Sequence, residues 1–459
     1  MSLLDMLFQR HPTFDGGVHP PQSKALTADL PIRQFPFAPV LNIPLNQHIG
    51  QPAIPVVREG QEVERGALLA KPDGYMSVAL HAPASGVVRR IGLMPSITGK
   101  MVPGIYLQPF PGATQEVQSG QPCNIETASA EDIIQAIQMA GIVGLGGAAF
   151  PTHAKLKAPA GKHIDTLIIN GAECEPFLTN DYRVMLEQPD EILTGIHYLL
   201  NATGCRRAVI GIEDNKAAAA QALQTCLSGK HTSLTGKIEV VVVLTKYPQG
   251  AEKMLIEALI GRQVPRGGLP HDVGVVVVNV TSAAEIGRLL PRGLGIQERV
   301  ITISGPAVNK PGNYRIPIGT PLRFALDYVG VSDSITEVYL GGPMMGQALP
   351  NLDISITKGT SGFTAFTDSQ TTSPHHVFPC IHCAYCVDAC PMHLNPSQLG
   401  LLAKHGEVSK MAEDFHLFDC FECGSCAFVC PSHIPLVQQF RAAKAEVRKM
   451  AAVHTGADA

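Results

Sequence analysis

The chain has 459 residues, enough for three or four domains, and its 45% of hydrophobic residues can form substantial buried cores. Basic and acidic residues nearly balance, 35 Lys and Arg against 39 Asp and Glu, which argues against a nucleic-acid or anionic-lipid binding protein. No apolar run approaches the roughly 20 residues that a membrane helix needs, and the first ten residues lack the pattern of a secretory signal. We therefore expect a soluble or peripheral chain.

Proline and glycine dominate the N-terminal part of the chain, which predicts an extended arm over residues 1–50 that wraps another domain. Short β-type runs alternate with turns over residues 51–118. The Glu59–Gly66 and Ala82–Val87 segments of this region resemble the two halves of a biotinyl/lipoyl-type β-sandwich. The modified lysine of that fold, flanked by methionines, is missing from Lys71–Met76. We therefore expect a docking domain without an attached cofactor.

Residues 119–295 alternate helical and buried-strand patterns, which is typical of a mostly parallel α/β sheet. Ser129 and Asp132 have the spacing of a helix N-cap, and this helix should end near Gly141. Strands are expected at four places: 166–170, 208–212, 239–245 and 273–278.

Three further regions follow the α/β domain. Residues 296–352 have short runs and a helix pattern at Pro321–Val329, which predicts a small β-grasp domain. Residues 353–377 are rich in Ser and Thr and are expected to form a linker. The region 378–446 should form a domain of its own, because it holds eight of the 12 cysteines, and 447–459 should be a tail.

These eight cysteines form two copies of the pattern C-x2-C-x2-C-x3-C-P, Cys380–Pro391 and Cys420–Pro431. This spacing binds iron in [4Fe-4S] clusters, and in two-cluster proteins the fourth cysteine of each copy ligates the other copy's cluster. Zinc sites usually lack the third close cysteine, and disulfide frameworks belong to short secreted chains. The predicted ligand sets are Cys380, Cys383, Cys386 and Cys430 for the first cluster, and Cys420, Cys423, Cys426 and Cys390 for the second. The remaining four cysteines are expected to be reduced thiols.

A glycine-rich stretch follows the first helix of the α/β domain, from Gly141 to Lys155. Glycines let the backbone approach a phosphate, and Lys155 adds positive charge. The stretch formally fits the dinucleotide fingerprint, but that fingerprint requires a preceding strand, so an ordinary Rossmann site is disfavoured. Spacing alone leaves a phosphate site and a structural glycine turn equally open.

Polar residues also follow the predicted strands. Asn170 ends one strand and precedes Glu173 and Glu175, while Gly250 with Glu252 and Asn279 follow later strands. Open α/β sheets bind ligands at the carboxyl ends of their strands. The three loops should therefore converge on one edge of the sheet.

Several motifs resemble a known family: Gly146-Gly147-x-x-Phe150-Pro151-Thr152, Asn170-x-x-Glu173-x-Glu175-Pro176 and Tyr247-x-x-Gly250-x-Glu252 are similar to the flavin- and NADH-binding subunit of respiratory complex I. Nearly the whole chain, including Gly267–Asp272 and Gly341–Gly346, resembles the RnfC (RsxC) family of Rnf (Rsx) complexes. The resemblance implies that FMN is held by Gly146, Gly147, Lys155, Asn170, Glu173, Gly250 and Asn279, and that NADH is held by Phe150, Glu175 and Glu252. Three positions depart from the complex I pattern: Leu145, Ala149 and Val278.

The implied function is a peripheral subunit on the cytoplasmic face of a bacterial inner membrane, belonging to an ion-translocating ferredoxin:NAD oxidoreductase. NAD(H) exchanges a hydride and each cluster passes one electron, so non-covalent FMN belongs between them, and no side chain is expected to be catalytic. Expected partners are the other subunits of the complex and a ferredoxin or ferredoxin-type subunit, with NADH as substrate and no nucleic acid. Two alternatives stay open: an iron-sulfur wiring or scaffold subunit without flavin, and a soluble NADH-dependent reductase for another acceptor.

Overall fold

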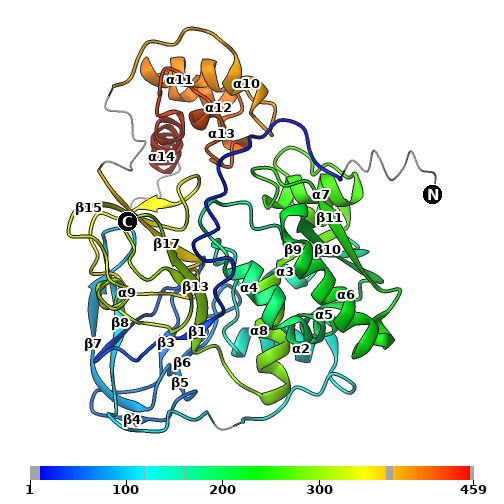
Figure 1. Ribbon diagram of the computed structural model, residues 1–459, viewed down its shortest axis with the longest axis vertical. Coiled ribbons are helices and arrows are strands. Elements are labelled where there is room, and N and C mark those ends of the chain that lie inside the picture. The colour runs from blue at the N-terminus through cyan, green and yellow to red at the C-terminus, as the bar shows by residue number, and fades with distance from the viewer. Residues whose placement is uncertain (1–10, 118, 160, 369–375, 455–459) are drawn as a thin grey trace.

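The structure is a computed structural model that describes residues 11–117, 119–159, 161–368 and 376–454. Figure 1 shows four parts: a β-sandwich at the lower left, an α/β domain at the right, a β-grasp domain at the left and a small helical domain at the top. The expected multidomain α/β architecture is confirmed.

The sandwich consists of two antiparallel sheets, ordered β2-β8-β7-β4 and β3-β5-β6. Its strands are β2 Leu41–Pro44, β3 Ile54–Pro55, β4 Glu62–Val63, β5 Leu68–Lys71, β6 Leu80–His81, β7 Gly86–Pro95 and β8 Met101–Pro109. Small and aliphatic side chains such as Leu41, Leu69 and Ile105 fill the space between the sheets. The strand β2 lies within the stretch that we expected to be an arm, because it pairs with the distant strand β8.

The α/β domain contains a four-stranded parallel sheet in the order β11-β10-β9-β12. All four strand predictions are confirmed, at β9 Thr166–Gly171, β10 Arg207–Glu213, β11 Ile238–Val243 and β12 Val275–Asn279. The predicted N-cap is also confirmed, since α2 (Ala130–Met139) begins after Ser129 with a capping box to Asp132.

Helices cover both faces of this sheet because its strands are apolar on both sides. Leu167 and Ile169 of β9 pack on one face with α2, α5 and α8, whereas Ile168 packs on the other with α7. The helices are α3 Thr152–Leu156, α4 Asn180–Glu187, α5 Pro189–Thr203, α6 Ala217–Gly229, α7 Glu252–Ile260 and α8 Val280–Leu289, with short 3-10 turns at Asp214–Lys216, Thr232–Leu234, Pro270–Val273 and Leu290–Arg292.

The β-grasp domain is a six-stranded mixed sheet in the order β1-β14-β13-β17-β15-β16, packed against the helix α9 (Leu322–Val329). Its strands are β1 Arg33–Gln34, β13 Glu298–Ser304, β14 Gly312–Pro317, β15 Ile335–Leu340, β16 Gln347–Ala348 and β17 Gly362–Thr367. The expected linker 353–377 was therefore wrong over the part that includes β17. Ile354, Ile356 and Phe363 are core residues, and threonine is as suited to a buried strand as to a loop.

The helical domain contains α10 Tyr385–Asp388, α11 Pro396–Lys404, α12 Val408–Glu413, α13 Ser425–Phe428, α14 Leu436–His454 and a 3-10 turn at Leu417–Asp419. Leu399, Met411 and Phe440 form its small core. The expected end of the domain at 446 was wrong, because α14 continues to His454. Among the described helices, none is long and apolar enough to cross a membrane.

The arm runs along the other parts of the molecule, as the dark blue trace in Figure 1 shows. Val18 forms an antiparallel bridge with Tyr247 of the α/β domain, and β1 adds an edge strand to the β-grasp sheet. The arm thus packs against partners far along the chain, as expected, although residues 1–50 contain the two strands β1 and β2. Its first ten residues lie outside the described ranges.

Candidate functional site

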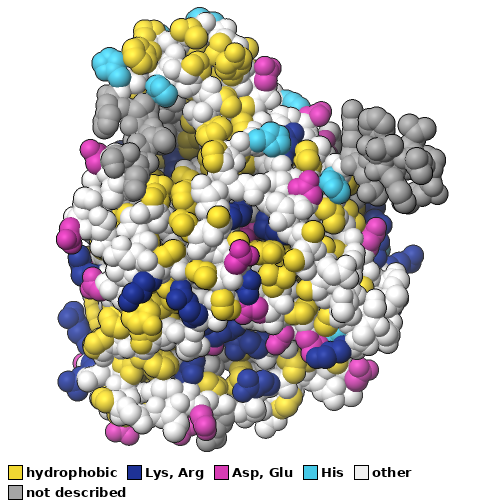
Figure 2. Space-filling model, in the orientation of Figure 1, with side chains coloured by type: hydrophobic (Ala, Val, Ile, Leu, Met, Phe, Trp, Pro, Cys, Tyr) yellow, Lys and Arg dark blue, Asp and Glu magenta, His cyan; other side chains and the backbone are white. Residues whose placement is uncertain are grey.

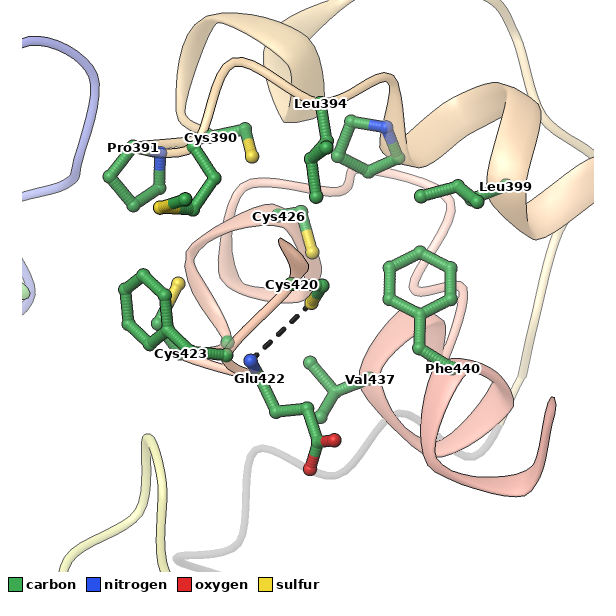
Figure 3. A pocket seen from close by; sticks show the side chains of 14 residues that line it. Cys390, Pro391, Leu394, Leu399, Cys420, Glu422, Cys423, Cys426, Val437 and Phe440 are labelled. Carbon is green, nitrogen blue, oxygen red and sulfur yellow. Dashed lines mark hydrogen bonds between the residues drawn. The ribbon is translucent and has the colours of Figure 1, made fainter. Parts of the chain in front are cut away.

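Four cysteines of the helical domain line one small cavity (Figure 3). Cys420, Cys423 and Cys426 come from the second motif, and Cys390 comes from the end of the first motif. Apolar side chains, among them Leu394, Leu399, Val437 and Phe440, form the rest of the lining. The structure therefore brings together the four thiols of the second predicted ligand set.

The backbone between the cysteines has the same unusual shape in both motifs. His382 and Ala384 in the first motif have positive φ angles of 55° and 64°, and Glu422 and Gly424 in the second have 64° and 87°. Residues other than glycine seldom adopt this conformation. These positive φ angles bend each C-x2-C-x2-C run so that its three thiols lie close together. This arrangement fits a [4Fe-4S] cluster.

In the second set Cys390, Cys423 and Cys426 are buried, and Cys420 is partly buried. Burial is the largest cause that raises the pKa of Cys420, to about 11, and burial also raises the pKa values of Cys390, Cys423 and Cys426. Iron is bound by thiolates, so metal binding must displace these protons. The cavity is thus poorly suited to free thiolates and well suited to a compact iron centre that neutralises them.

The first predicted set lies nearer the surface. Cys380 is exposed, and Cys383, Cys386 and Cys430 are partly buried. After burial, the charge of Cys430 is the next largest cause that raises the pKa of Cys386, which means that these two sulfurs are close neighbours. The structure thus draws Cys430 toward the first motif, just as it draws Cys390 toward the second.

The glycine-rich stretch forms a closed turn before α3. The Gly144 amide donates to the Phe150 carbonyl (2.8 Å), and the Ala149 amide donates back to the Gly144 carbonyl (3.0 Å). The buried Arg299 guanidinium donates to the Leu145 carbonyl (2.5 Å) from the β-grasp side. Gly147, at φ +108°, has open space where a side chain would stand, so its backbone is accessible to a ligand.

Three strand-end loops meet beside this turn, as predicted. Asn170 and Asn279 are paired across β9 and β12, and the Asn170 amide donates to the Gly250 carbonyl (2.8 Å). A Cβ on Gly146 would stand 3.1 Å from the Asn279 amide nitrogen. The structure therefore brings Gly146, Asn170, Gly250 and Asn279 to one edge of the sheet.

Lys155 lies at the same edge and pairs with Glu252 at 3.0 Å. Its ammonium is also 5.9 Å from the centroid of the Phe150 ring. Both members of the ion pair are about a third exposed, so water screens their attraction and either can take a new partner at small cost. Lys155 is thus placed to meet an anionic ligand.

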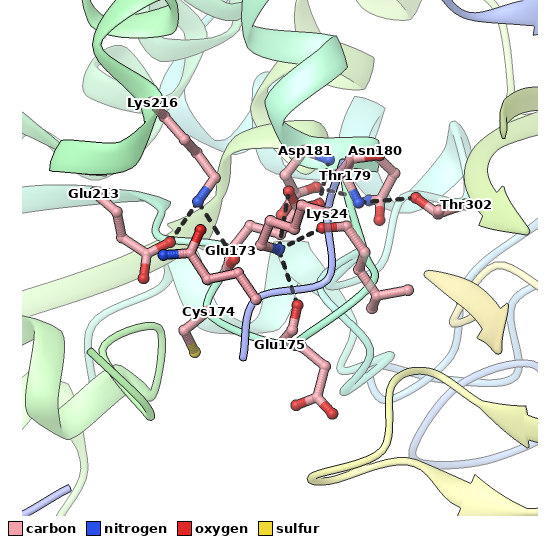
Figure 4. A network of polar contacts seen from close by, with 12 residues as sticks. Lys24, Glu173, Cys174, Glu175, Thr179, Asn180, Asp181, Glu213, Lys216 and Thr302 are labelled. Atoms are coloured by element: carbon pink, nitrogen blue, oxygen red, sulfur yellow. Dashed lines mark hydrogen bonds and ion pairs between the residues drawn. The ribbon is translucent and has the colours of Figure 1, made fainter. Parts of the chain in front are cut away.

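Glu173 is held in a buried polar network (Figure 4). Its Oε1 accepts the Asp181 amide (2.8 Å), and Lys24 of the arm lies 3.9 Å from its Oε2, an atom that lacks a hydrogen bond. Burial raises the pKa of Glu173 to about 7, while the Lys24 ammonium opposes that rise. In this network Lys216 also pairs with Glu213 at 2.5 Å. Glu173 therefore has a structural environment that the sequence did not show.

Glu175 points to the β-grasp domain. Its Oε1 accepts the backbone amides of Met344 (2.6 Å) and Met345 (3.1 Å), in the glycine-rich loop Gly341–Gly346. Burial raises the pKa of Glu175 to about 6. Glu175 thus joins two domains at the ligand edge.

Several residues that build this edge had no predicted role. Asp181 accepts hydrogen bonds from Asn279 (2.7 Å) and Thr281 (2.6 Å), and so orients the predicted flavin ligand. Asp181 follows the Asn170–Pro176 motif closely in the chain, and this proximity was the available signal. For Arg299 and Lys24 the sequence held no such signal, because their partners at this edge are 154 and 151 residues away.

The fold and the residues gathered at this edge and in the cysteine cavity define the chain as an iron-sulfur flavoprotein of electron transfer. Family models match four regions: a Nuo51 FMN-binding domain at 137–288, an RnfC barrel sandwich hybrid domain at 12–109, an SLBB domain at 300–348 and a 4Fe-4S dicluster domain at 379–434. FMN and two [4Fe-4S] clusters are accordingly its cofactors.

Curated relatives match over most of the chain. The C subunit of the proton-translocating ferredoxin:NAD(+) oxidoreductase complex of Clostridium ljungdahlii is 43% identical over 95% of this chain and 94% of its own. The Na(+)-translocating counterpart of Acetobacterium woodii is 39% identical over 84% and 86%. The C subunit of the ion-translocating oxidoreductase complex of Haemophilus influenzae strain 86-028NP is 40% identical over 95% of this chain and 64% of its own. The chain belongs to the RnfC family, the C subunits of ion-translocating oxidoreductase complexes.

Solved structures share the fold at lower identity. The NAD+-reducing [NiFe]-hydrogenase in its air-oxidized state has a TM-score of 0.51 and 21% identity, covering 63% of this chain and 55% of that one. Its H2-reduced state has a TM-score of 0.51 and 19% identity, over 73% and 70%. This likeness concerns the fold alone.

Proposed function

We propose that this chain exchanges hydride between NAD(H) and FMN, and passes single electrons through two [4Fe-4S] clusters to the other subunits of an ion-translocating ferredoxin:NAD oxidoreductase. The observation that carries the proposal is the contact between the two candidate centres. The Tyr247 hydroxyl, on the loop that also carries Gly250, donates to the Cys423 carbonyl at 2.5 Å. A flavin edge and a cluster cavity that adjoin in one chain suit a two-electron to one-electron converter.

Each candidate residue has a proposed task at the flavin edge. The Gly146-Gly147 backbone and the Lys155 ammonium hold the flavin phosphate, since open amides and a cation are the usual phosphate partners. Asn170, Glu173, Gly250 and Asn279 fix the rest of the flavin from the strand ends. FMN when bound supplies the chemistry, because it accepts a hydride and releases electrons singly.

Phe150, Glu175 and Glu252 are proposed to hold the nicotinamide nucleotide against the flavin. Glu252 is free to do so once a phosphate engages Lys155, because the present ion pair is solvent-screened. Phe150 offers an aromatic face on the same side as Lys155.

We also place the chain on the cytoplasmic face of a bacterial inner membrane, as a peripheral subunit. Its relatives are named as subunits of ion-translocating complexes, and in the part of the chain that the structure describes no helix can cross a bilayer. Fractionation should release the chain from membranes with high salt or carbonate. Extraction only by detergent would contradict this placement.

The purified, iron-loaded protein tests the electron-transfer proposal directly. NADH added without oxygen should bleach a flavin absorbance band near full stoichiometry and then reduce the clusters, followed by their paramagnetic signals. A protein that binds both clusters but neither binds flavin nor responds to NADH would instead be a wiring or scaffold subunit.

A further inference from the structure

The two cysteine sets lie differently with respect to the flavin edge. Tyr247 is 1% exposed and forms one apolar cluster with Val18, Ala389 and Cys423. Cys174, which lies between Glu173 and Glu175, packs against this cluster, and its sulfur accepts the Gly250 amide at 3.4 Å. Buried contacts therefore run from the strand-end loops of the α/β domain to the backbone of the second cysteine motif.

The arm fills the same junction from the other side. The Gly17 amide donates to the Ala389 carbonyl (3.0 Å), and Val18 exchanges backbone hydrogen bonds with Tyr247 (2.8 and 2.9 Å). A Cβ on Gly16 would stand 3.0 Å from the Cys390 carbonyl oxygen, and one on Gly17 only 2.6 Å from that of Tyr247. Both glycines also have positive φ angles, so the close approach depends on them. The arm and Tyr247 thus contact the helical domain next to the cavity that Cys390 and Cys423 line.

The first set is more exposed to solvent than the second. Cys380 is exposed, and its neighbours Ile381 and Tyr385 are 65% and 58% exposed. The helix α10, which begins at Tyr385, lies at the top of Figure 1, and the space-filling view shows hydrophobic and histidine side chains at that end of the molecule (Figure 2). Phe428, two residues before Cys430, is also exposed. An electron at this set is therefore close to solvent and to whatever docks there.

We propose that the cluster bound by Cys390, Cys420, Cys423 and Cys426 exchanges electrons with the flavin directly, that the cluster bound by Cys380, Cys383, Cys386 and Cys430 is the terminal one, and that Tyr247 is the positioning residue that couples flavin edge and inner cluster. The inference rests on the proposed function. It adds the order of the two clusters and a role for Tyr247, which is not itself proposed to bind the flavin or a cluster.

The electron balance requires one pass per electron. One NADH delivers two electrons and a proton as hydride, and becomes NAD+. The two electrons would leave the flavin singly through the inner cluster to the outer one, where each would reduce one equivalent of an external one-electron acceptor protein, and the proton that arrived with the hydride would be released to solvent. Two such acceptors are therefore reduced for each NADH oxidised, and the same path runs in reverse when the acceptor is the donor.

Tyr247→Phe tests the coupling, because it removes the hydroxyl and retains the buried ring. In rapid mixing of the loaded protein with NADH, flavin reduction should keep its rate, while the later cluster reduction slows roughly tenfold, as for other residues that orient a metal ligand. The paramagnetic signal of the cluster that Cys423 ligates should also shift, and the other signal should not. Tyr385→Phe is the matched control, with the same atom removed beside the outer cluster, and should change neither quantity. Equal behaviour of the two variants would overturn the role of Tyr247.

The order itself predicts an asymmetry between cysteine variants. Cys380→Ser, which disables the outer cluster, should leave the inner cluster reducible by NADH. Cys423→Ser should leave the outer cluster reducible by dithionite but not by NADH. The opposite pattern overturns the order. If a cysteine variant loses both clusters, the paramagnetic signals of Tyr247→Phe test the order instead. A signal shift confined to the outer cluster in Tyr247→Phe would also overturn the proposed order. Failure of NADH to reduce flavin in the unaltered protein would instead refute the proposed function.

Discussion

Lys155 gives the sharpest test of the flavin edge among single residues. Removal of its ammonium in Lys155→Ala should weaken FMN binding by about 1.5 to 3 kcal/mol, roughly 10- to 150-fold, as expected for a charge-assisted contact to phosphate. Titration of flavin-free protein with FMN, followed by flavin fluorescence, measures the change.

Lys157→Ala provides the control for that measurement. Lys157 is 57% exposed, pairs with Glu131 at 3.5 Å and lies only two residues further along the chain. It changes net charge equally, so it should leave FMN affinity within about twofold because exposed charges are screened. Unchanged flavin affinity in Lys155→Ala would refute the assignment.

Glu175 and Phe150 should affect the nucleotide step instead. Glu175→Gln keeps an oxygen that can accept the Met344 and Met345 amides, and removes only the charge. We expect this variant and Phe150→Ala to slow flavin reduction by NADH by roughly tenfold or more, since each removes a contact worth about one to three kcal/mol. Stopped-flow absorbance measures the rate. Iron and flavin contents should stay at parent values, and loss of both would reveal a folding defect instead.

Residue types alone suggested Glu173 and Asn279 as polar groups at a ligand edge. They could not predict which side chains surround these groups in the folded chain. The sequence shows that the Glu173 carboxylate follows a strand. It does not show that Lys24 of the arm lies beside this carboxylate, or that burial raises the pKa of Glu173 to about 7. The environment of a side chain depends on segments that meet only after folding. The role of a glycine is easier to predict, because a residue without a side chain can leave its backbone open to a ligand.

At the scale of elements, the two cysteine motifs are tied to each other. The cavity places Cys390 with Cys420, Cys423 and Cys426, so Cys390→Ser should perturb the same paramagnetic signal as Cys423→Ser. Cys430→Ser should perturb the same signal as Cys383→Ser. Electron paramagnetic resonance of the reduced variants distinguishes the pairs. A signal shared by Cys390→Ser and Cys383→Ser would mean that each motif closes its own cluster.

Element prediction succeeded where the local signal was strong. The capping box at Ser129 and the β-branched runs of the four parallel strands each specify one structure locally. It failed for β17, whose Thr-rich sequence resembles a linker and becomes a core strand by pairing with β13 and β15. Whether such a segment forms a strand depends on its pairing partners, and the partners that β13 provides lie about 60 residues earlier in the chain.

At the scale of the whole molecule, Lys358 joins three domains. Its buried ammonium donates to the carbonyls of Ala79 (2.6 Å) in the sandwich and Gly141 (2.7 Å) in the α/β domain, and its own carbonyl accepts Arg299. Burial lowers the pKa of Lys358 to about 7 from the usual 10.5. The joint is therefore sensitive to pH near neutrality.

That shift predicts a pH dependence of stability. Between pH 7 and about 10.5 the unfolded chain binds more protons at Lys358 than the folded chain, so the site makes the fold more stable as pH rises, by up to about 1.4 kcal/mol per pH unit. The parent protein should thus gain in apparent unfolding temperature relative to Lys358→Met between about pH 7 and pH 9, at a fixed calorimetric scan rate. A difference that stays constant with pH would contradict a lowered pKa.

Features that depend on local spacing could be predicted from the residues alone. Two C-x2-C-x2-C-x3-C-P motifs imply two clusters, the glycine-rich turn and strand-end polar residues imply a ligand edge, and the alternating patterns imply a parallel sheet. Long motifs also placed the chain in its family, as the relatives confirm. Each of these signals lies within a few tens of residues, where spacing alone limits the geometry.

How these parts adjoin became apparent only in the folded chain. It placed the second ligand set, which combines Cys390 with three cysteines of the second motif, beside the flavin edge, with Tyr247 on Cys423 and the arm glycine Gly16 against Cys390. It also made Lys24, Arg299 and Lys358 joints between domains, with Arg299 and Lys358 fully buried. The contacts of Lys24, Arg299 and Tyr247 join residues 151, 154 and 176 positions apart, and such contacts follow from the packing of whole domains, which no local pattern encodes.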